Sequence, residues 1–126
     1  MKVVIIVKLI IIVILGQTLF FKFTGASESI YIFEKLGAEP YGRIASGIVE
    51  LIASIAILIP RTALLGAFLA FGTMLGAIAS HLFVLGIDVQ NDGGTLFALA
   101  LVTASASLFL IYHERNKIPD LLKFKV

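Results

Sequence analysis

Long apolar runs, separated by short polar segments, extend along almost the whole chain. Four of these runs have the length that an α-helix needs to cross about 30 Å of hydrocarbon. They predict membrane-spanning helices at residues 3–21, 42–59, 63–87 and 95–112, followed by a polar and basic tail at 113–126. The sequence therefore predicts an all-α fold, an antiparallel bundle of four transmembrane helices in one integral membrane domain (residues 1–126).

The breaks between the runs contain residues that begin and end helices. Pro40 precedes the second run, where its fixed φ suits a first helical turn, and Pro60 follows that run. Because only Pro60, Arg61 and Thr62 separate the second run from the third, these two spans must form an antiparallel hairpin. The segment 88–94 joins the last two spans and is a turn by composition, with Asn91, Asp92 and two glycines.

One long connection, residues 22–41, joins the first two spans. It holds Ser27, a residue type that caps helix N-termini, and Gly37, a typical C-terminal stop. Between these two positions lie apolar and aromatic residues, namely Ile30, Tyr31, Phe33 and Leu36. This pattern predicts a short interfacial helix, with an ordinary loop as the alternative.

Composition supports a membrane protein and disfavours a soluble globular enzyme. Of the 126 residues, 60% are hydrophobic and 14% charged, against about 45–50% and about 25% in soluble domains. The mean hydropathy is +1.08. A water-soluble domain of this size could not bury the apolar surface that such a composition brings. The chain has no cysteine, which removes disulfides, thiolate metal sites and iron–sulfur clusters.

The basic residues indicate an orientation in the membrane rather than a nucleic-acid partner, which we do not expect despite the net charge of +2. With four spans, one side of the membrane receives Lys2, Lys8, Arg61, Arg115, Lys117, Lys123 and Lys125. The other side receives Lys22, Lys35 and Arg43. The positive-inside rule then places both termini in the cytoplasm. We expect the first run to be a retained span, since it exceeds the core of a cleaved signal peptide.

Glu50 is the most informative polar residue within a span. It lies eight residues into the second run, about 12 Å below the outer end, and charged groups at such depth face the bundle interior. The residues that share its helical face are Arg43, Ser46, Gly47 and Ser54. Two interpretations stay open: a carboxyl that carries a proton or binds a ligand, or a structural latch paired with Arg43, Lys22 or a neighbouring hydroxyl.

Three further residues belong to the same candidate ligand-binding or proton-relay site. His81 lies in the outer part of the third span, at about the level of Glu50, so that the two groups meet. Gln17 and Lys22 lie near the outer end of the first span, although Lys22 is long enough to reach the interface. We expect no metal site, because one histidine and one carboxylate are an incomplete ligand set. No catalytic residue is assigned.

A ridge of small residues follows one face of the third span, at Gly72, Gly76 and Ser80. Such four-residue spacing permits close approach of two membrane helices. We expect this ridge to pack inside the bundle, against a fourth span that carries its own small-residue face. A contact between copies in a homo-oligomer is the alternative.

Several segments together resemble the DoxX family of small four-span bacterial membrane proteins. They are QTLFFKFTG at 17–25, GR at 42–43, GIVEL at 47–51, GA at 66–67, MLGAIASHL at 74–82 and NDGG at 91–94. The resemblance implies a bacterial inner-membrane protein. It also implies, from some relatives, an association with quinone-linked oxidoreductases such as thiosulfate:quinone oxidoreductase.

Two functions follow as hypotheses. The first is a subunit or accessory protein of a quinone-linked membrane redox assembly, with no catalytic activity of its own. The second is a bundle that binds a quinone, lipid or other small molecule, or transports one, at the outer-leaflet site of Glu50 and His81. Quinone is the one cofactor that the resemblance suggests, and the lipid bilayer and redox proteins are the expected partners.

Overall fold

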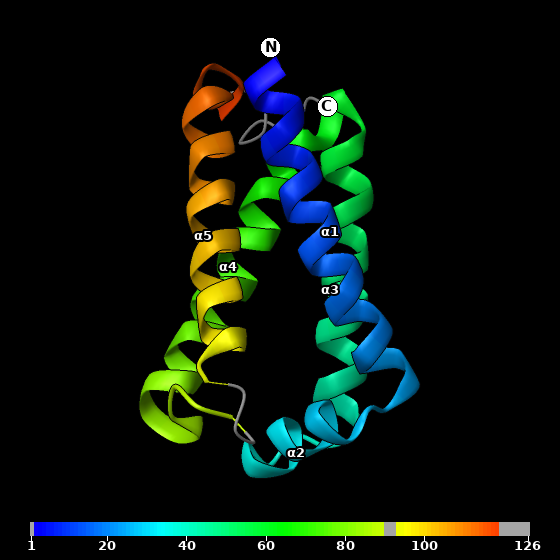
Figure 1. Ribbon diagram of the computed structural model, residues 1–126. Coiled ribbons are helices and arrows are strands. Elements are labelled where there is room, and N and C mark those ends of the chain that lie inside the picture. Colours follow the sequence, from blue (N-terminus) through cyan, green and yellow to red (C-terminus); the bar gives the residue numbers. More distant parts are fainter. Residues whose placement is uncertain (1, 90–92, 119–126) are drawn as a thin grey trace.

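The computed structural model describes residues 2–89 and 93–118, and these residues form helices and turns without any strand. The long helices are α1 (Lys2–Thr24), α3 (Tyr41–Leu58), α4 (Ala63–Ser80) and α5 (Thr95–His113), shown in Figure 1. Two short helical turns flank α4: η1 (Pro60–Thr62) precedes it and η2 (His81–Leu85) follows it. With them the apolar span extends over Pro60–Leu85. Four helices long and apolar enough to cross a membrane confirm the predicted all-α, four-span fold.

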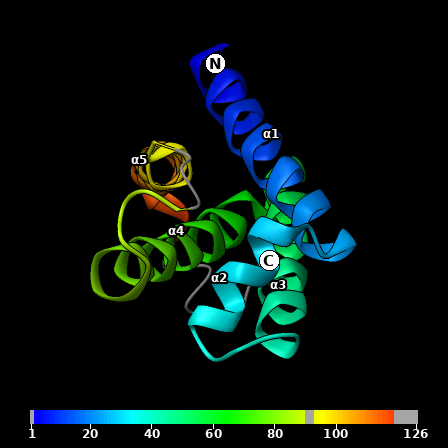
Figure 2. The same cartoon turned by 60° about the horizontal axis from the view of Figure 1, so that its bottom comes forward.

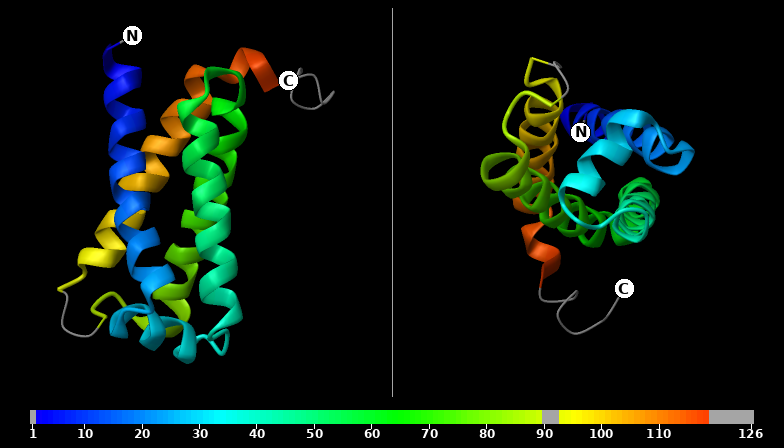
Figure 3. Two further views of the ribbon diagram at one scale, coloured as in Figure 1. Left: turned by 90° about the vertical axis from the view of Figure 1, so that its right-hand side faces the viewer. Right: turned by 90° about the horizontal axis from the view of Figure 1, so that it is seen from below.

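The four long helices form a ring in which each is antiparallel to both of its neighbours. Helix α1 packs against α3 and α5, and α4 packs against the same two helices. The start of α1 and the end of α5 therefore lie at one end of the bundle (Figure 1). The short helix α2 (Ser27–Lys35) lies across the other end, as Figures 2 and 3 show, and it confirms the predicted helix between the first two spans.

Helix α2 ends for the reason that its sequence suggests. Gly37 adopts a positive φ of 75°, and the N–H groups of Gly37 and Ala38 donate to the carbonyls of Glu34 and Phe33 at 3.0 and 2.8 Å. This pair of bonds is the Schellman arrangement, which satisfies the last carbonyls of a helix. Ser27, predicted as the N-cap, is instead the first helical residue; Ala26 occupies the cap position, and no side chain caps it.

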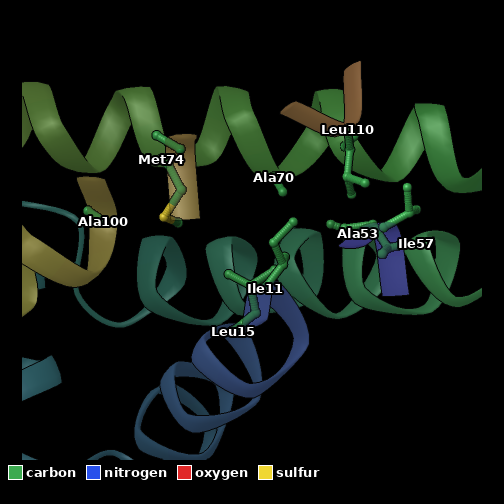
Figure 4. Close-up of a cluster of buried hydrophobic side chains, with 11 residues drawn as sticks. Ile11, Leu15, Ala53, Ile57, Ala70, Met74, Ala100 and Leu110 are labelled. Carbon is green, nitrogen blue, oxygen red and sulfur yellow. The ribbon is translucent and has the colours of Figure 1, made fainter. Parts of the chain in front are cut away.

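The hydrophobic core is formed by the inward stripes of all four long helices (Figure 4). Ile11, Leu15, Ala53, Ile57, Ala67 and Ala70 are completely buried, and Leu110 is 1% exposed. At the opposite surface, large apolar side chains such as Val13, Phe20 and Leu58 are more than half exposed. Soluble proteins rarely expose so large a continuous apolar surface to water, so this exterior is suited to contact with lipid.

Helices α3 and α4 approach each other closely at Gly66 of α4. A Cβ added there would lie 2.7 Å from the carbonyl oxygen of Ala53 and from the amide nitrogen of Ile57, both in α3. The backbones of α3 and α4 therefore touch at this point. Glycine is required because any side chain would push the two helices apart.

The ridge at Gly72, Gly76 and Ser80 was predicted to pack inside the bundle, and the helix contacts correct that prediction. Gly72 and Gly76 are exposed, and a Cβ added at either would meet no heavy atom within 4 Å. The buried face of α4 instead follows Ala63, Leu64, Gly66, Ala67, Ala70 and Met74. Four-residue spacing shows which residues share a face, but it does not show which face meets a neighbouring helix.

Candidate functional site

A cavity of about 530 Å³ lies among the four long helices at the end of the bundle that α2 crosses. Helices α1, α2, α3, α4 and α5 all contribute to its wall, together with η2. Apolar side chains form part of that wall, including Ile14, Phe21, Ile32, Met74, Leu96 and Leu99. Its polar and charged wall includes Gln17, Lys22, Ser46, Glu50, Ser80 and His81. Four of the five predicted site residues therefore line one space, and Arg43 is the exception.

An ion pair between Lys22 of α1 and Glu50 of α3 lies in the wall of this cavity. Lys22 Nζ is 3.0 Å from Glu50 Oε1, and the side chains are only 11% and 1% exposed. Of the partners considered for Glu50, the structure selects Lys22. The lysine therefore turns into the bundle and does not extend to the membrane surface.

The Glu50 carboxylate is enclosed by the protein. Its Oε1, the oxygen that faces the Lys22 ammonium, is buried. The ammonium also lies 5.6 Å from the centre of the Phe33 ring of α2, within the range of a cation–π contact. Charge is therefore balanced within the pair.

Arg43, at the start of α3, holds the framework of the site from outside the cavity. Its guanidinium forms an ion pair with Glu39, with Nη2 2.9 Å from Oε1, and Nη1 donates to the backbone carbonyl of Lys22. The second bond ties the last turn of α1 to the first turn of α3. Arg43 therefore positions the backbone of Lys22, and its own charge is neutralised by Glu39.

His81 enters the cavity wall from a π-helical turn that follows α4. Regular helix stops at Ser80, and η2 (His81–Leu85) ends at Gly86, which has a φ of +80°. His81 is 5% exposed, and its ring meets the ring of Phe97 edge-on with centres 5.5 Å apart. The predicted third span continued to residue 87, and its sequence gave no signal for this change of helix type. π-Helical turns occur frequently at functional sites.

The hydrogen bond of His81 fixes which ring nitrogen carries a proton. Nδ1 lies 2.9 Å from the carbonyl oxygen of Gly86. Since a carbonyl can only accept, Nδ1 must be the donor, and in the neutral ring Nε2 is then an acceptor. His81 and Glu50 share the cavity, but no ion pair or hydrogen bond joins their side chains in the described ranges.

Helix α2 supplies wall residues that the sequence did not single out as part of a site. Ser29 is 8% exposed and lines the cavity together with Ser27 and Phe33. One sequence feature could have indicated them: the predicted short helix follows Lys22 closely, so it was placed to cover a site that includes Lys22. Asn91 and Asp92, predicted in the turn before α5, and the tail residues Lys123 and Lys125 lie outside the described residues.

The arrangement suits non-covalent binding. No three His, Asp or Glu side chains gather as a metal site within residues 2–89 and 93–118. Apolar walls can hold a hydrocarbon tail or ring, and the few convergent polar groups can orient a polar head.

The chain was compared with known protein families and known proteins. The model of the DoxX-like family matches residues 6–108. This range begins in α1, ends in α5 and includes all the residues that line the cavity. No curated protein and no solved structure matches the chain.

Proposed function

The chain belongs to the DoxX-like family, and on that premise we propose that it binds a small amphipathic molecule within the membrane, in the cavity beside α2. The observation that carries this proposal is the cavity of about 530 Å³, with apolar walls and a buried Lys22–Glu50 pair in contact with it. Known ligand pockets have volumes of about 300–1,000 Å³ and combine apolar walls with a few polar groups.

The buried ion pair favours a binding role over a purely structural one. Burial of two charges is costly, and well-packed apolar residues of similar size commonly give equal or greater stability. Glu50 and Lys22 also face open space that other side chains do not fill. A pair that served only as a latch between α1 and α3 would not need such a space beside it.

A quinone is one ligand that this cavity suits, and a membrane lipid is another. The ring or acyl chain would lie along apolar residues such as Ile14, Met74 and Leu99, with its head near Lys22 and Glu50. In the quinone case the Lys22 ammonium would donate to a ring carbonyl. Proton transfer to a reduced quinone would use Glu50 or His81.

Mass spectrometry of small molecules co-extracted with the protein tests this function. The protein would be purified mildly from its own membrane as the unmodified chain, as Glu50→Gln and as the control Gly72→Ala, which changes α4 outside the cavity. We expect one stoichiometric quinone or lipid with the unmodified chain and the control, and its loss in Glu50→Gln. Equal absence of a specific molecule from all three folded proteins would make Glu50 a structural latch.

A second candidate function is support of a quinone-linked redox assembly as a non-catalytic subunit. The resemblance of the sequence to DoxX proteins supports it, since that resemblance implies an association with quinone-linked oxidoreductases. Chemical crosslinking in native membranes, followed by purification, would return a redox enzyme with this chain. Recovery of the chain alone would count heavily against the role.

We further propose that the protein resides in the bacterial inner membrane with both termini in the cytoplasm, so that α2 and the cavity face outward. The distribution of lysine and arginine supports this orientation. Because the chain has no cysteine, single cysteines can report it. Lys35→Cys should react with a membrane-impermeant maleimide in intact cells, and Arg61→Cys only after permeabilisation. The reverse pattern would invert the topology.

A further inference from the structure

We infer that the ligand carries a carbonyl about 7 Å inward from its polar head, and that the side-chain amide of Gln17 donates a hydrogen bond to this carbonyl. This inference rests on the proposed function and specifies its ligand class, an amphipathic molecule with two hydrogen-bonding groups spaced along the bundle axis. The cavity wall points to this class because most of its hydroxyl groups have partners, whereas the Gln17 amide has none among the described residues.

Four hydroxyl groups of the cavity wall are already committed as donors. Each donates to a backbone carbonyl of its own helix, at distances between 2.8 and 3.2 Å. The four residues are Thr18, Ser46, Thr73 and Ser80. Since each hydroxyl has a single hydrogen, these oxygens can only accept from a ligand.

Gln17 differs from these four residues. It lines the cavity from α1, its side chain is exposed, and its amide makes no hydrogen bond within residues 2–89 and 93–118. It lies about 10 Å before the end of α1, within a helix apolar enough to cross a membrane. An amide without partners is costly in apolar surroundings. A bound molecule that supplies the partner removes this cost.

Lys22 and Ser29 form a separate polar level, nearer to the end of the bundle that α2 crosses. Ser29 is 8% exposed, and its hydroxyl makes no hydrogen bond in the part of the chain that the structure describes. The Lys22 ammonium has three N–H donors, of which one is directed to Glu50 at 3.0 Å. Lys22 follows Gln17 by five residues, about 7 Å along the helix. A head beneath α2 therefore meets Lys22 and Ser29, and Gln17 is left for a second group at greater depth.

This second group must accept a hydrogen bond, because the Gln17 amide nitrogen carries two N–H donors. A carbonyl accepts through its oxygen and brings no donor that needs a partner in return. That property suits this depth, since Ile14 and Phe21, which flank Gln17 on its helical face, are apolar wall residues. An ester-linked lipid and a quinone both carry a carbonyl inward from another polar group.

Two lipids that differ by one carbonyl test the inference: 1-lauroylglycerol and its ether analogue 1-O-dodecylglycerol. Their binding would be measured on the full chain in nanodiscs of a diether phospholipid, which carries no ester carbonyl. Empty nanodiscs of the same lipid correct for partition. We expect the ester to bind about fivefold more tightly than the ether, as one hydrogen bond between neutral groups provides.

Gln17→Met is the variant for this test, because methionine keeps the length of the side chain and removes its hydrogen-bonding groups. In this variant the ester and the ether should bind equally. Val13→Met, at a position of α1 that is 67% exposed and outside the cavity, is the matched control and should keep the preference for the ester. Both variants should fold normally, since neither replaced side chain is buried.

A third probe, 2-decyl-1,4-benzoquinone, identifies the source of the carbonyl. A loss of binding in Gln17→Met that is confined to the ester assigns an ester-linked lipid, and one confined to the quinone assigns a quinone. If the substitution changes the binding of neither carbonyl probe, the inference is overturned while the binding function stands. An equal loss of the ether would overturn it too. Retention of no probe above empty nanodiscs would contradict the function itself.

Discussion

The two ends of the helix bundle are built differently. In the half that holds the start of α1 and the end of α5, here the terminal half, Ile11 and Ile57 are fully buried and Gly66 brings two backbones into contact. In the other half, here the α2 half, the helix pairs α1/α3 and α4/α5 diverge in Figure 1, and the cavity lies there. One half is packed mainly with apolar side chains, whereas the other surrounds an open space with an ion pair.

This difference between the two halves suggests that the terminal half provides stability and that the α2 half provides the binding site. Close apolar contacts in the terminal half hold the four helices together without any help from charged groups. The α2 half contains the buried pair of Lys22 and Glu50, the π-helical turn at His81 and the cover formed by α2. Costly features of this kind concentrate where a protein binds something.

The largest expected effect comes from breaking the ion pair. Lys22→Met or Glu50→Leu alone should reduce the free energy of unfolding by about 3–5 kcal/mol, because the remaining charge is buried without a partner. The double variant should recover most of that loss and still fail to retain the ligand. Unfolding by SDS titration in mixed micelles measures all three. Additive losses in the double variant would show that the pair itself carries the stability of the α2 half.

A substitution in the terminal half gives the next largest effect. Gly66→Ala should destabilise the protein by about 1–3 kcal/mol, since its Cβ would collide with the backbone of α3. Gly72→Ala, in the same helix with no neighbour within 4 Å, is the matched control and should be neutral or slightly stabilising. Thermal unfolding followed by circular dichroism compares the two. Similar midpoints would contradict the close contact at Gly66.

Arg43→Gln should cost less stability than Gly66→Ala but weaken ligand retention several-fold. The substitution removes the bond to the Lys22 carbonyl and the ion pair with Glu39, so Lys22 loses its backbone anchor. Arg61→Gln, which removes an exposed arginine from η1, is the control for charge. Quantifying the co-purified ligand in both variants gives the readout. Unchanged retention in Arg43→Gln would remove its positioning role.

The smallest change in stability is expected from filling the cavity at Gly76. Gly76 lines the cavity and has open space at its Cβ position, so Gly76→Leu should fold normally, with a change in stability of about 1 kcal/mol or less. It should nevertheless exclude the ligand, whereas Gly72→Leu should not. Ligand content and thermal midpoint measured on the same samples separate the two effects. Full ligand content in Gly76→Leu would place the bound molecule elsewhere.

Sequence reasoning predicted the framework of this molecule well because hydrophobic run length and helix-breaking residues determine it. The four long helices, α2 and its stop at Gly37 follow from local patterns. The grouping of Gln17, Lys22, Glu50 and His81 at one end of the bundle followed from their depths in the spans.

Details that depend on side-chain direction could not be predicted in the same way. Lys22 has a chain long enough to reach either the membrane surface or Glu50, and only the tertiary arrangement decides between them. Arg43 shares a helical face with Glu50, yet it pairs with Glu39 four residues earlier. The ridge at Gly72 and Gly76 was expected to contact a neighbouring helix, but its spacing fits helix contact and open space equally.

Photo-crosslinking in native membranes tests the central claim, a specific ligand in the α2 half, most directly. A photoactivatable residue would replace Ala77, which lines the cavity, or Val102, which is 47% exposed on α5. We expect a single small-molecule adduct at position 77 and a mixture of bulk phospholipids at position 102. The same phospholipid mixture at both positions would contradict it, because the cavity would then be an ordinary lipid-filled gap.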